Sequence, residues 1–226
     1  MKFIHSIDPK EGFASLASRI SSVLNSNKPV LWLVCGGSNV PVAFDAFKSI
    51  KAQVASRSLS LLTIGQTDER YGPIGHVDSN WQQLIEAGFD FKSLKSLPIL
   101  IGKPLDQTVS AYSNAIEVAI ADVKGSNGLI VALFGIGPDG HIAGLLPHSP
   151  AVDSTEPVCG YEAGKFTRVT LTPIALKKTD VAYVFAFGES KKEALTNLQE
   201  KELSLDDQPA QILKELKEVF VYSDQV

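Results

Sequence analysis

Residues 128–141 read GLIVALFGIGPDGH, and this stretch decides the fold class. Residues 129–134 form a short, continuous apolar run, far below the ~20 residues that a membrane helix needs. Such a run is typical of a strand that is buried on both faces. The glycine-rich turn behind it displays two polar side chains, Asp139 and His141. In sheets built from such strands, ligands bind beyond the carboxyl ends of the strands.

The same pattern recurs on both sides of this stretch. Further strands are predicted over residues 30–35, 59–64, 181–187 and 218–222. Apolar residues at helical spacing lie between them and predict helices over residues 41–50, 80–87 and 107–123. The alternation predicts an α/β fold, with a Rossmann-like, largely parallel sheet and helices on both faces. Residues 145–165, rich in Pro, Ser, Gly and Glu, are expected to form a surface loop.

Composition limits the class of protein. The chain has 226 residues, of which 44% are hydrophobic and 20% charged, and we expect a single globular domain over residues 1–226. A net charge of −4 argues against nucleic-acid and anionic-membrane partners. The N-terminus lacks the apolar core of a signal peptide, so a cytoplasmic location is expected. The two cysteines suggest neither disulfides nor a metal site, and Cys35 is expected to be a small buried residue rather than a catalytic thiol.

The turn Gly36-Gly37-Ser38 follows the first apolar strand and precedes a predicted helix. Glycines let the backbone approach an anion closely, and a helix N-terminus presents free N–H groups and partial positive charge. This arrangement suits a phosphate group. An ordinary strand-to-helix turn, in which Ser38 or Asn39 caps the helix, explains the residues as well.

Charged residues stand close to the ends of other predicted strands. They are Asp68, Arg70 and Lys191, with Arg168 on a short predicted strand at residues 168–172. The planar guanidinium of Arg70 suits a phosphate or a carboxylate, and an anionic ligand would explain a lysine at the N-terminus of a helix. The alternatives are a solvated turn with local ion pairs around Arg70 and a solvent-facing Lys191.

His141 is the candidate general base. Imidazole titrates near neutral pH, and a glycine-rich loop at a strand end displays a side chain instead of burying it. Asp139, two residues earlier, is placed to orient the imidazole or to bind a substrate hydroxyl. Asp68 is the next candidate base. No second histidine or cysteine has the spacing of a metal site.

Together, and in this order, the motifs resemble those of the 6-phosphogluconolactonases, which are related to the glucosamine-6-phosphate deaminases and isomerases. The resemblance runs from about Leu31 to Leu213 and rests on residues 36–38, 68–70, His76, Ser79-Asn80, 135–141, 168–170, Lys191 and Pro209-Ala210. It implies a Rossmann-like fold, no required cofactor and a small sugar phosphate as partner. It also implies that His141 activates water and that phosphate is bound by Gly36, Gly37, Ser38, Arg70, Arg168 and Lys191. Arg70 is equally a candidate for stabilising the developing oxyanion.

The implied reaction is the hydrolysis of 6-phospho-D-glucono-1,5-lactone to 6-phosphogluconate. Deaminases of the related group carry an acid five residues after the histidine, and Leu146 stands there in this chain. In contrast, Ile142 resembles the deaminases, since lactonases more often have Thr. The first turn also has one more residue between Ser38 and Pro41 than is usual in the family. The remaining alternatives are a deaminase-like enzyme and a non-catalytic sugar-phosphate sensor.

Overall fold

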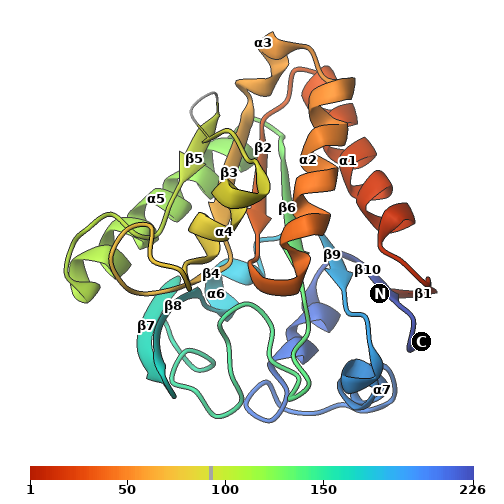
Figure 1. Cartoon of the computed structure of the whole chain (residues 1–226), viewed down its shortest axis with the longest axis vertical. Coiled ribbons are helices and arrows are strands. Elements are labelled where there is room, and N and C mark those ends of the chain that lie inside the picture. The colour runs from red at the N-terminus through yellow and green to blue at the C-terminus, as the bar shows by residue number, and fades with distance from the viewer. Residues whose placement is uncertain (92–93) are drawn as a thin grey trace.

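The computed structural model describes residues 1–91 and 94–226 (Figure 1). Its main element is a seven-stranded sheet in which every pair of neighbouring strands is parallel. The order across the sheet is β1 (Lys2–His5), β10 (Glu218–Ser223), β9 (Val181–Phe185), β6 (Leu129–Phe134), β2 (Val30–Val34), β3 (Leu62–Gln66) and β5 (Lys95–Leu97). The predicted fold class is therefore confirmed.

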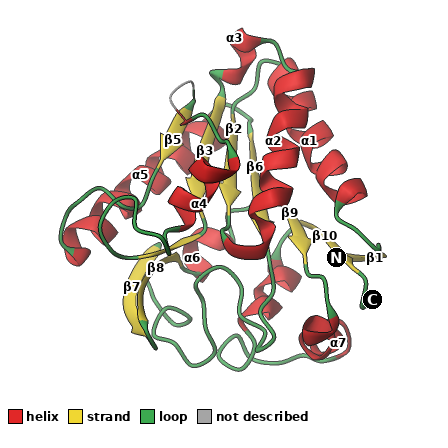
Figure 2. Ribbon diagram, in the orientation of Figure 1, coloured by secondary structure: helices red, strands yellow, loops and turns green. Residues whose placement is uncertain are grey.

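Helices cover both faces of this sheet (Figure 2). Side chains of β2 alternate between two apolar clusters: Leu31 and Leu33 belong to one, and Trp32 belongs to the other. The cluster around Trp32 includes side chains of α1 (Lys10–Asn25), α2 (Val40–Gln53) and α4 (Asn80–Ala87). The opposite cluster includes side chains of α5 (Leu105–Gly125), α6 (Pro173–Leu176) and α7 (Lys192–Glu200). A strand buried on both faces must be apolar throughout, which is why these strands read as continuous apolar runs.

A second, smaller sheet is antiparallel and has the order β4 (Asp68–Arg70), β8 (Phe166–Leu171), β7 (Val158–Ala163). Val169 and Leu171 of β8 join the same apolar cluster as Leu31 of the large sheet. The register places Arg70 directly opposite Arg168. The small sheet thus brings Arg70 and Arg168, which are far apart in the sequence, together beside the large sheet.

Three expectations about elements need correction. Residues 145–165 are not simply a surface loop, because they contain β7 and the buried side chains Leu145 and Val152. Gly160 interrupts the sequence pattern of a strand at this point. A glycine is needed because α5 packs closely on Gly160, where a Cβ would meet the Val109 side chain. The strand expected over residues 59–64 begins at Leu62, because α3 (Ser56–Leu59) precedes it. The short edge strands β1 and β5 were not predicted.

After β1 at one edge, the chain enters the middle of the sheet at β2, continues toward β3 and β5, and then runs from β6 in the other direction. The strand order reverses between β2 and β6, so the connections that leave these two strands diverge. A crevice at the carboxyl ends of such strands is the usual ligand site of this fold. Within residues 1–91 and 94–226, no helix has the length and apolar character required to cross a membrane.

Candidate active site

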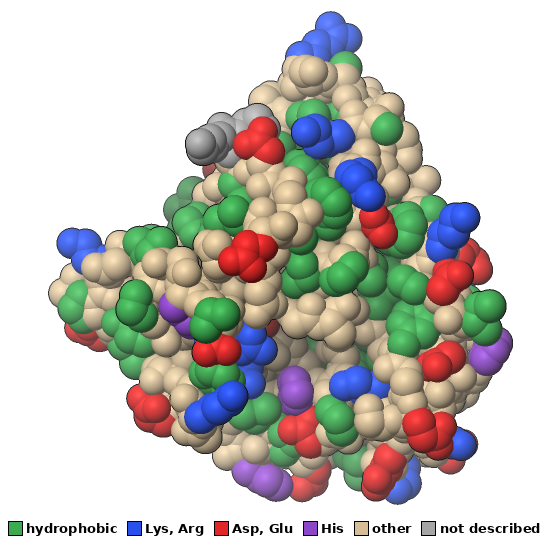
Figure 3. Space-filling model, viewed as in Figure 1, with side chains coloured by type: hydrophobic (Ala, Val, Ile, Leu, Met, Phe, Trp, Pro, Cys, Tyr) green, Lys and Arg blue, Asp and Glu red, His purple; other side chains and the backbone are tan. Residues whose placement is uncertain are grey.

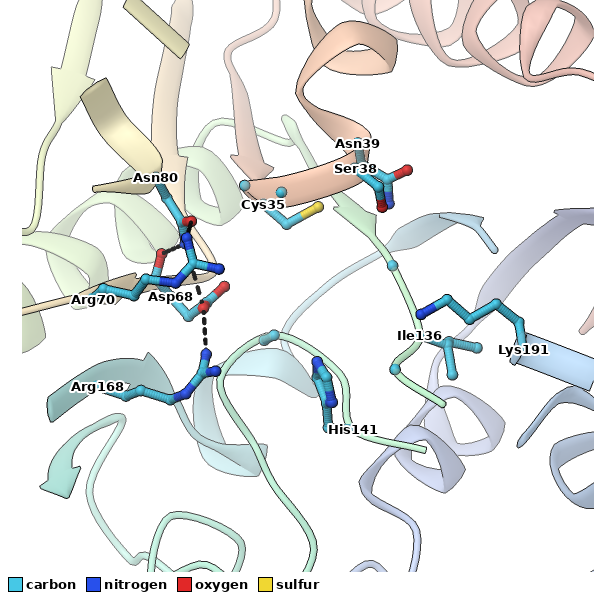
Figure 4. Close-up of a pocket in the computed structure, with 15 residues that line it drawn as sticks. Cys35, Ser38, Asn39, Asp68, Arg70, Asn80, Ile136, His141, Arg168 and Lys191 are labelled. Atoms are coloured by element: carbon cyan, nitrogen blue, oxygen red, sulfur yellow. Dashed lines mark hydrogen bonds and ion pairs between the residues drawn. The ribbon is translucent and has the colours of Figure 1, made fainter. Parts of the chain in front are cut away.

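A pocket of about 240 Å³ opens at the carboxyl ends of β2 and β6. The space-filling view shows a hollow near the middle of the molecule, with basic and histidine side chains around it (Figure 3). All of the site residues predicted from the sequence except Asp139 line this pocket: Gly36, Gly37, Ser38, Asp68, Arg70, His141, Arg168 and Lys191. In the close-up, Arg70 and Arg168 lie on one side, Lys191 on the other, and His141 between them (Figure 4).

Asp139 is bonded to His141, with 2.6 Å between Oδ1 and the imidazole Nδ1. This hydrogen bond lowers the pKa of the Asp139 carboxyl to about 2, so the group is a carboxylate at neutral pH and can only accept. Nδ1 must therefore carry the hydrogen, and in the neutral imidazole Nε2 is left with a lone pair. The His141 side chain is 31% exposed. A base with a fixed tautomer thus faces the pocket.

The loop that carries this pair is held by hydrogen bonds within the loop and by one from another segment. The Gly137 N–H donates to the His141 carbonyl at 2.9 Å, and the Gly140 N–H donates to the Gly137 carbonyl at 3.0 Å. The Ala210 N–H, on η4 (Pro209–Glu215), donates to the Gly140 carbonyl at 2.9 Å. Gly137 has no room for a side chain, because a Cβ would overlap His141 and Asp139. These contacts explain why glycines surround the pair.

The two arginines form a cationic cluster in the small sheet. Like charges directly opposite each other on antiparallel strands destabilise the pair. Arg168 lies 3.6 Å from Asp68, whereas Arg70 is held by neutral acceptors, Asp78 O at 2.9 Å and Asn80 Oδ1 at 3.1 Å. The Nε atoms of both arginines are buried without a hydrogen-bond partner in the described structure. Such a cluster is suited to bind an anion that compensates the charge.

Asn80 is a site residue whose role no local pattern in the sequence indicates. Its side chain lines the pocket and bonds to both Arg70 and Asp68. Ser79 caps α4 by accepting from the Gln82 N–H at 3.1 Å, so an Asn beside a helix cap reads as part of the cap. Only the packing shows that its amide faces Gly36 across the pocket wall.

The turn after β2 places Asn39 at the N-cap position of α2, as the alternative interpretation expected, but without a side-chain hydrogen bond to the helix. The buried Asn39 donates from Nδ2 to Phe134 O and to Phe185 O, both at 3.1 Å, and so ties the ends of β6 and β9 to this turn. Gly37 adopts a φ of 67°, which favours glycine. The turn lines the pocket with backbone rather than with bulky side chains.

Lys191 lies at the end of η3 (Glu189–Lys191), directly before α7. Burial lowers the pKa of its ammonium, while the nearby Asp139 carboxylate opposes this shift. Its neighbour Lys192 is 61% exposed and pairs with Glu189, as expected for a surface lysine. Cys35 also lines the pocket, but burial raises the pKa of its thiol to about 12, so it is no thiolate nucleophile.

Known proteins resemble this chain over most of its length. The chain is 29% identical over 192 residues to the 6-phosphogluconolactonase of Mycobacterium bovis, covering 80% of this chain and 76% of that protein. It is 26% identical over 243 residues to the glucosamine-6-phosphate deaminase of Lactobacillus johnsonii, covering 100% and 95%. The solved 6-phosphogluconolactonase of Trypanosoma cruzi has the same fold, with a TM-score of 0.77 at 19% identity over 99% of this chain and 94% of that one.

A sequence model of one family spans nearly the whole chain and all of the pocket. It matches residues 10–221 and is described as glucosamine-6-phosphate isomerases/6-phosphogluconolactonase. The match includes the turn after β2, the small sheet, the His141 loop and Lys191. The chain therefore belongs to the family of glucosamine-6-phosphate isomerases and 6-phosphogluconolactonases.

Proposed function

We propose that this protein hydrolyses 6-phospho-D-glucono-1,5-lactone to 6-phosphogluconate. The observation that carries the proposal is the His141–Asp139 pair, which presents a general base to a pocket with cations on both sides. A lactone carbonyl is already electrophilic, so its hydrolysis needs a positioned water and a base that works near neutral pH. The 6-phosphogluconolactonases among the chain's relatives support the same reaction.

The reaction follows from the geometry of the pair. Neutral His141 takes a proton from water at Nε2 while the water oxygen attacks the lactone carbonyl carbon. The Asp139 carboxylate, 2.6 Å from Nδ1, stabilises the imidazolium that forms. When the tetrahedral intermediate collapses, the bond between the carbonyl carbon and the ring oxygen breaks. The imidazolium then returns its proton to the ring oxygen, and the open-chain acid is released.

The cations have two anions to bind, the phosphate and the oxygen that gains charge during attack. Arg70, Arg168 and Lys191 line the pocket together with the backbone of Gly36 and Gly37. Charge-assisted hydrogen bonds from such groups are the strong ones. We assign phosphate binding to this set, and Arg70 serves either the phosphate or the oxyanion.

The deaminase is the second candidate, because one relative over the full length of the chain is a deaminase. The residue at the position of the deaminases' acid argues against it. Leu146 packs against the apolar cluster of the sheet and has no group that moves a proton. Lactone hydrolysis needs no such acid beyond His141 itself.

A pair of assays tests the proposal. The wild-type protein should hydrolyse 6-phosphogluconolactone well above the spontaneous rate and should release no ammonia from glucosamine 6-phosphate. Ammonia release would make it a deaminase. Binding of either sugar phosphate without turnover of either would make it a sensor. Because the lactone also opens unaided, and faster at high pH, every rate requires subtraction of a protein-free blank.

We further propose one domain over residues 1–226, because side chains of both sheets share one apolar cluster. The expected cytoplasmic location, and the expectation that no nucleic acid or membrane is a partner, stay predictions from the sequence. The family supports a small sugar phosphate as the partner.

A further inference from the structure

We propose that Asn80 is a positioning residue, which aims Arg70 and Asp68 at the substrate. The inference rests on the proposed function for its substrate. The amide Oδ1 accepts from Arg70 Nη1 at 3.1 Å. The amide Nδ2 donates to Asp68 O at 3.0 Å and to Asp68 Oδ2 at 3.4 Å. Figure 4 shows Asn80 above the cluster that Arg70, Asp68 and Arg168 form.

The amide makes both sets of contacts from one neutral side chain. It donates from nitrogen to Asp68 and accepts on oxygen from Arg70, whereas a carboxylate only accepts. An aspartate here would direct a second negative charge at Asp68 and would pair with Arg70. With asparagine, a neutral acceptor orients the guanidinium without compensating its charge. Arg70 forms no ion pair within the described structure, so its charge remains available to the substrate.

The position of the amide is itself fixed by the surrounding structure. Asn80 is 3% exposed. The buried carboxylate of Glu69 accepts from the Asn80 N–H at 2.6 Å and from the Trp81 N–H at 2.9 Å, which holds the first turn of α4. On the pocket side, Gly36 gives the amide room, because a Cβ at that position would overlap Asn80 Oδ1. The amide therefore links the turn after β2, the small sheet and α4.

The physical consequence is that Asn80 acts through Arg70. Removing the amide removes one of the two hydrogen bonds that orient the guanidinium, which leaves the bond to Asp78 O and the face of the Phe166 ring to hold it. Replacing the amide by a carboxylate keeps the orientation but neutralises the charge. The second change should cost more than the first if the charge of Arg70 is what the substrate uses. A role in packing alone predicts the reverse order, because aspartate preserves the size of the side chain.

The test measures kcat and KM for Asn80→Ala, Asn80→Asp, Arg70→Gln and the double variant Asn80→Ala/Arg70→Gln. Gln82→Ala is the matched control, since Gln82 lies on α4 outside the pocket and its side-chain nitrogen donates to Glu86. We expect Asn80→Ala to lower kcat/KM at least tenfold and to change the same constant, kcat or KM, as Arg70→Gln. The double variant should be no slower than Arg70→Gln, because coupled residues are non-additive. Asn80→Asp should be slower than Asn80→Ala.

Additive losses in the double variant, or Asn80→Asp faster than Asn80→Ala, would overturn the inference. If Asn80→Ala does not fold, Asn80→Asp carries the test against Arg70→Gln. If the wild-type protein fails to exceed the blank rate, the proposed function fails separately. The same cycle is then run on the rise in Tm caused by 6-phosphogluconate, where Asn80→Ala must still match Arg70→Gln. A Tm rise equal to that of the wild type would again overturn the inference.

Discussion

His141 and its partner show how much of the chemistry lies in single residues. The imidazole is oriented by a carboxylate only two residues away, so the pair depends on a short loop and not on distant packing. A second pair of the same type, His148 and Asp206, joins two surface segments at 2.7 Å and does not line the pocket. The two pairs have the same hydrogen bond, but only the first one faces a cavity with cations.

The first prediction compares these two histidines. His141→Asn should lower kcat by roughly 10²–10⁴-fold, the usual contribution of a positioned general base, while KM changes much less. His148→Asn should leave both constants unchanged; asparagine is chosen because it tolerates the φ of 57° at that residue. Steady-state kinetics and Tm are measured for both. A folded His141→Asn protein with near-wild-type kcat would exclude His141 and make Asp68 the candidate base.

The second prediction concerns pH. The pKa of Asp139 is about 2, below its usual value of 3.8, so the carboxylate stays ionised in any assay above pH 4. Lowering the pH should therefore remove the contribution of this carboxylate only as the pH approaches 2. Asp139→Asn removes the charge at every pH, so kcat should fall across the whole blank-corrected profile. A variant with the kcat of the wild type would show that Asp139 does not act on His141.

At the level of elements, the turn after β2 and the His141 loop are held by hydrogen bonds to main-chain groups of other segments. Asn39 ties the first loop to the last residues of β6 and β9. Ala210 of η4 holds the loop of His141 from the other side. Each of these contacts has a main-chain acceptor, and the Asn39 side chain that makes the first two is buried. The turn after β2 and the loop of the base are consequently held from several segments of the chain.

The third prediction tests the tightness of the His141 loop. In Gly137→Ala the new Cβ would overlap the imidazole and the Asp139 carboxylate, so the pair must move. A displacement near 1 Å can cost roughly 10²-fold in rate, and we expect kcat to fall by about that factor. Gly125→Ala is the control, because nothing lies near that position. Equal kcat in the two variants would show that the loop tolerates the displacement.

At the level of the whole molecule, the cations of the pocket come from two separate parts of the fold. Arg70 and Arg168 come from the small sheet and Lys191 from the segment before α7. An anion that contacts the arginines and Lys191 together links the small sheet to the segment that follows β9. Binding energy at the pocket should therefore appear as stability of the folded chain, because a ligand stabilises only the state that it binds.

The fourth prediction measures this linkage. Phosphate or citrate should raise the Tm of the wild-type protein, and Arg168→Ala and Lys191→Ala should each reduce that rise. Each variant loses a charge-assisted hydrogen bond of about 1.5–3 kcal/mol, which weakens binding by roughly 10- to 150-fold. Lys192→Ala, which alters an exposed neighbour, should keep the full rise. Full protection in both test variants would place the anion elsewhere.

The sequence by itself determined the parts of this protein that depend on neighbours along the chain. Continuous apolar runs identified β2, β6 and β9, because burial on both faces excludes polar residues. Glycines around Asp139 and His141 indicated a displayed pair, and the structure shows that pair bonded. Even the convergence of the motifs followed from their positions after parallel strands.

Only the tertiary structure decided which residues meet across the chain. The sequence does not predict strand β7, because Gly160 is required by the contact with α5 and breaks the pattern expected of a strand. The register of β4 and β8 places Arg70 opposite Arg168. A periodic pattern along the sequence does not predict a partner that lies about a hundred residues away. Asn80 has its role from Gly36, Asp68 and Arg70, which reach it from separate segments. The physical reason is that a pattern along the sequence records how deeply a residue is buried, whereas packing in three dimensions selects its partners.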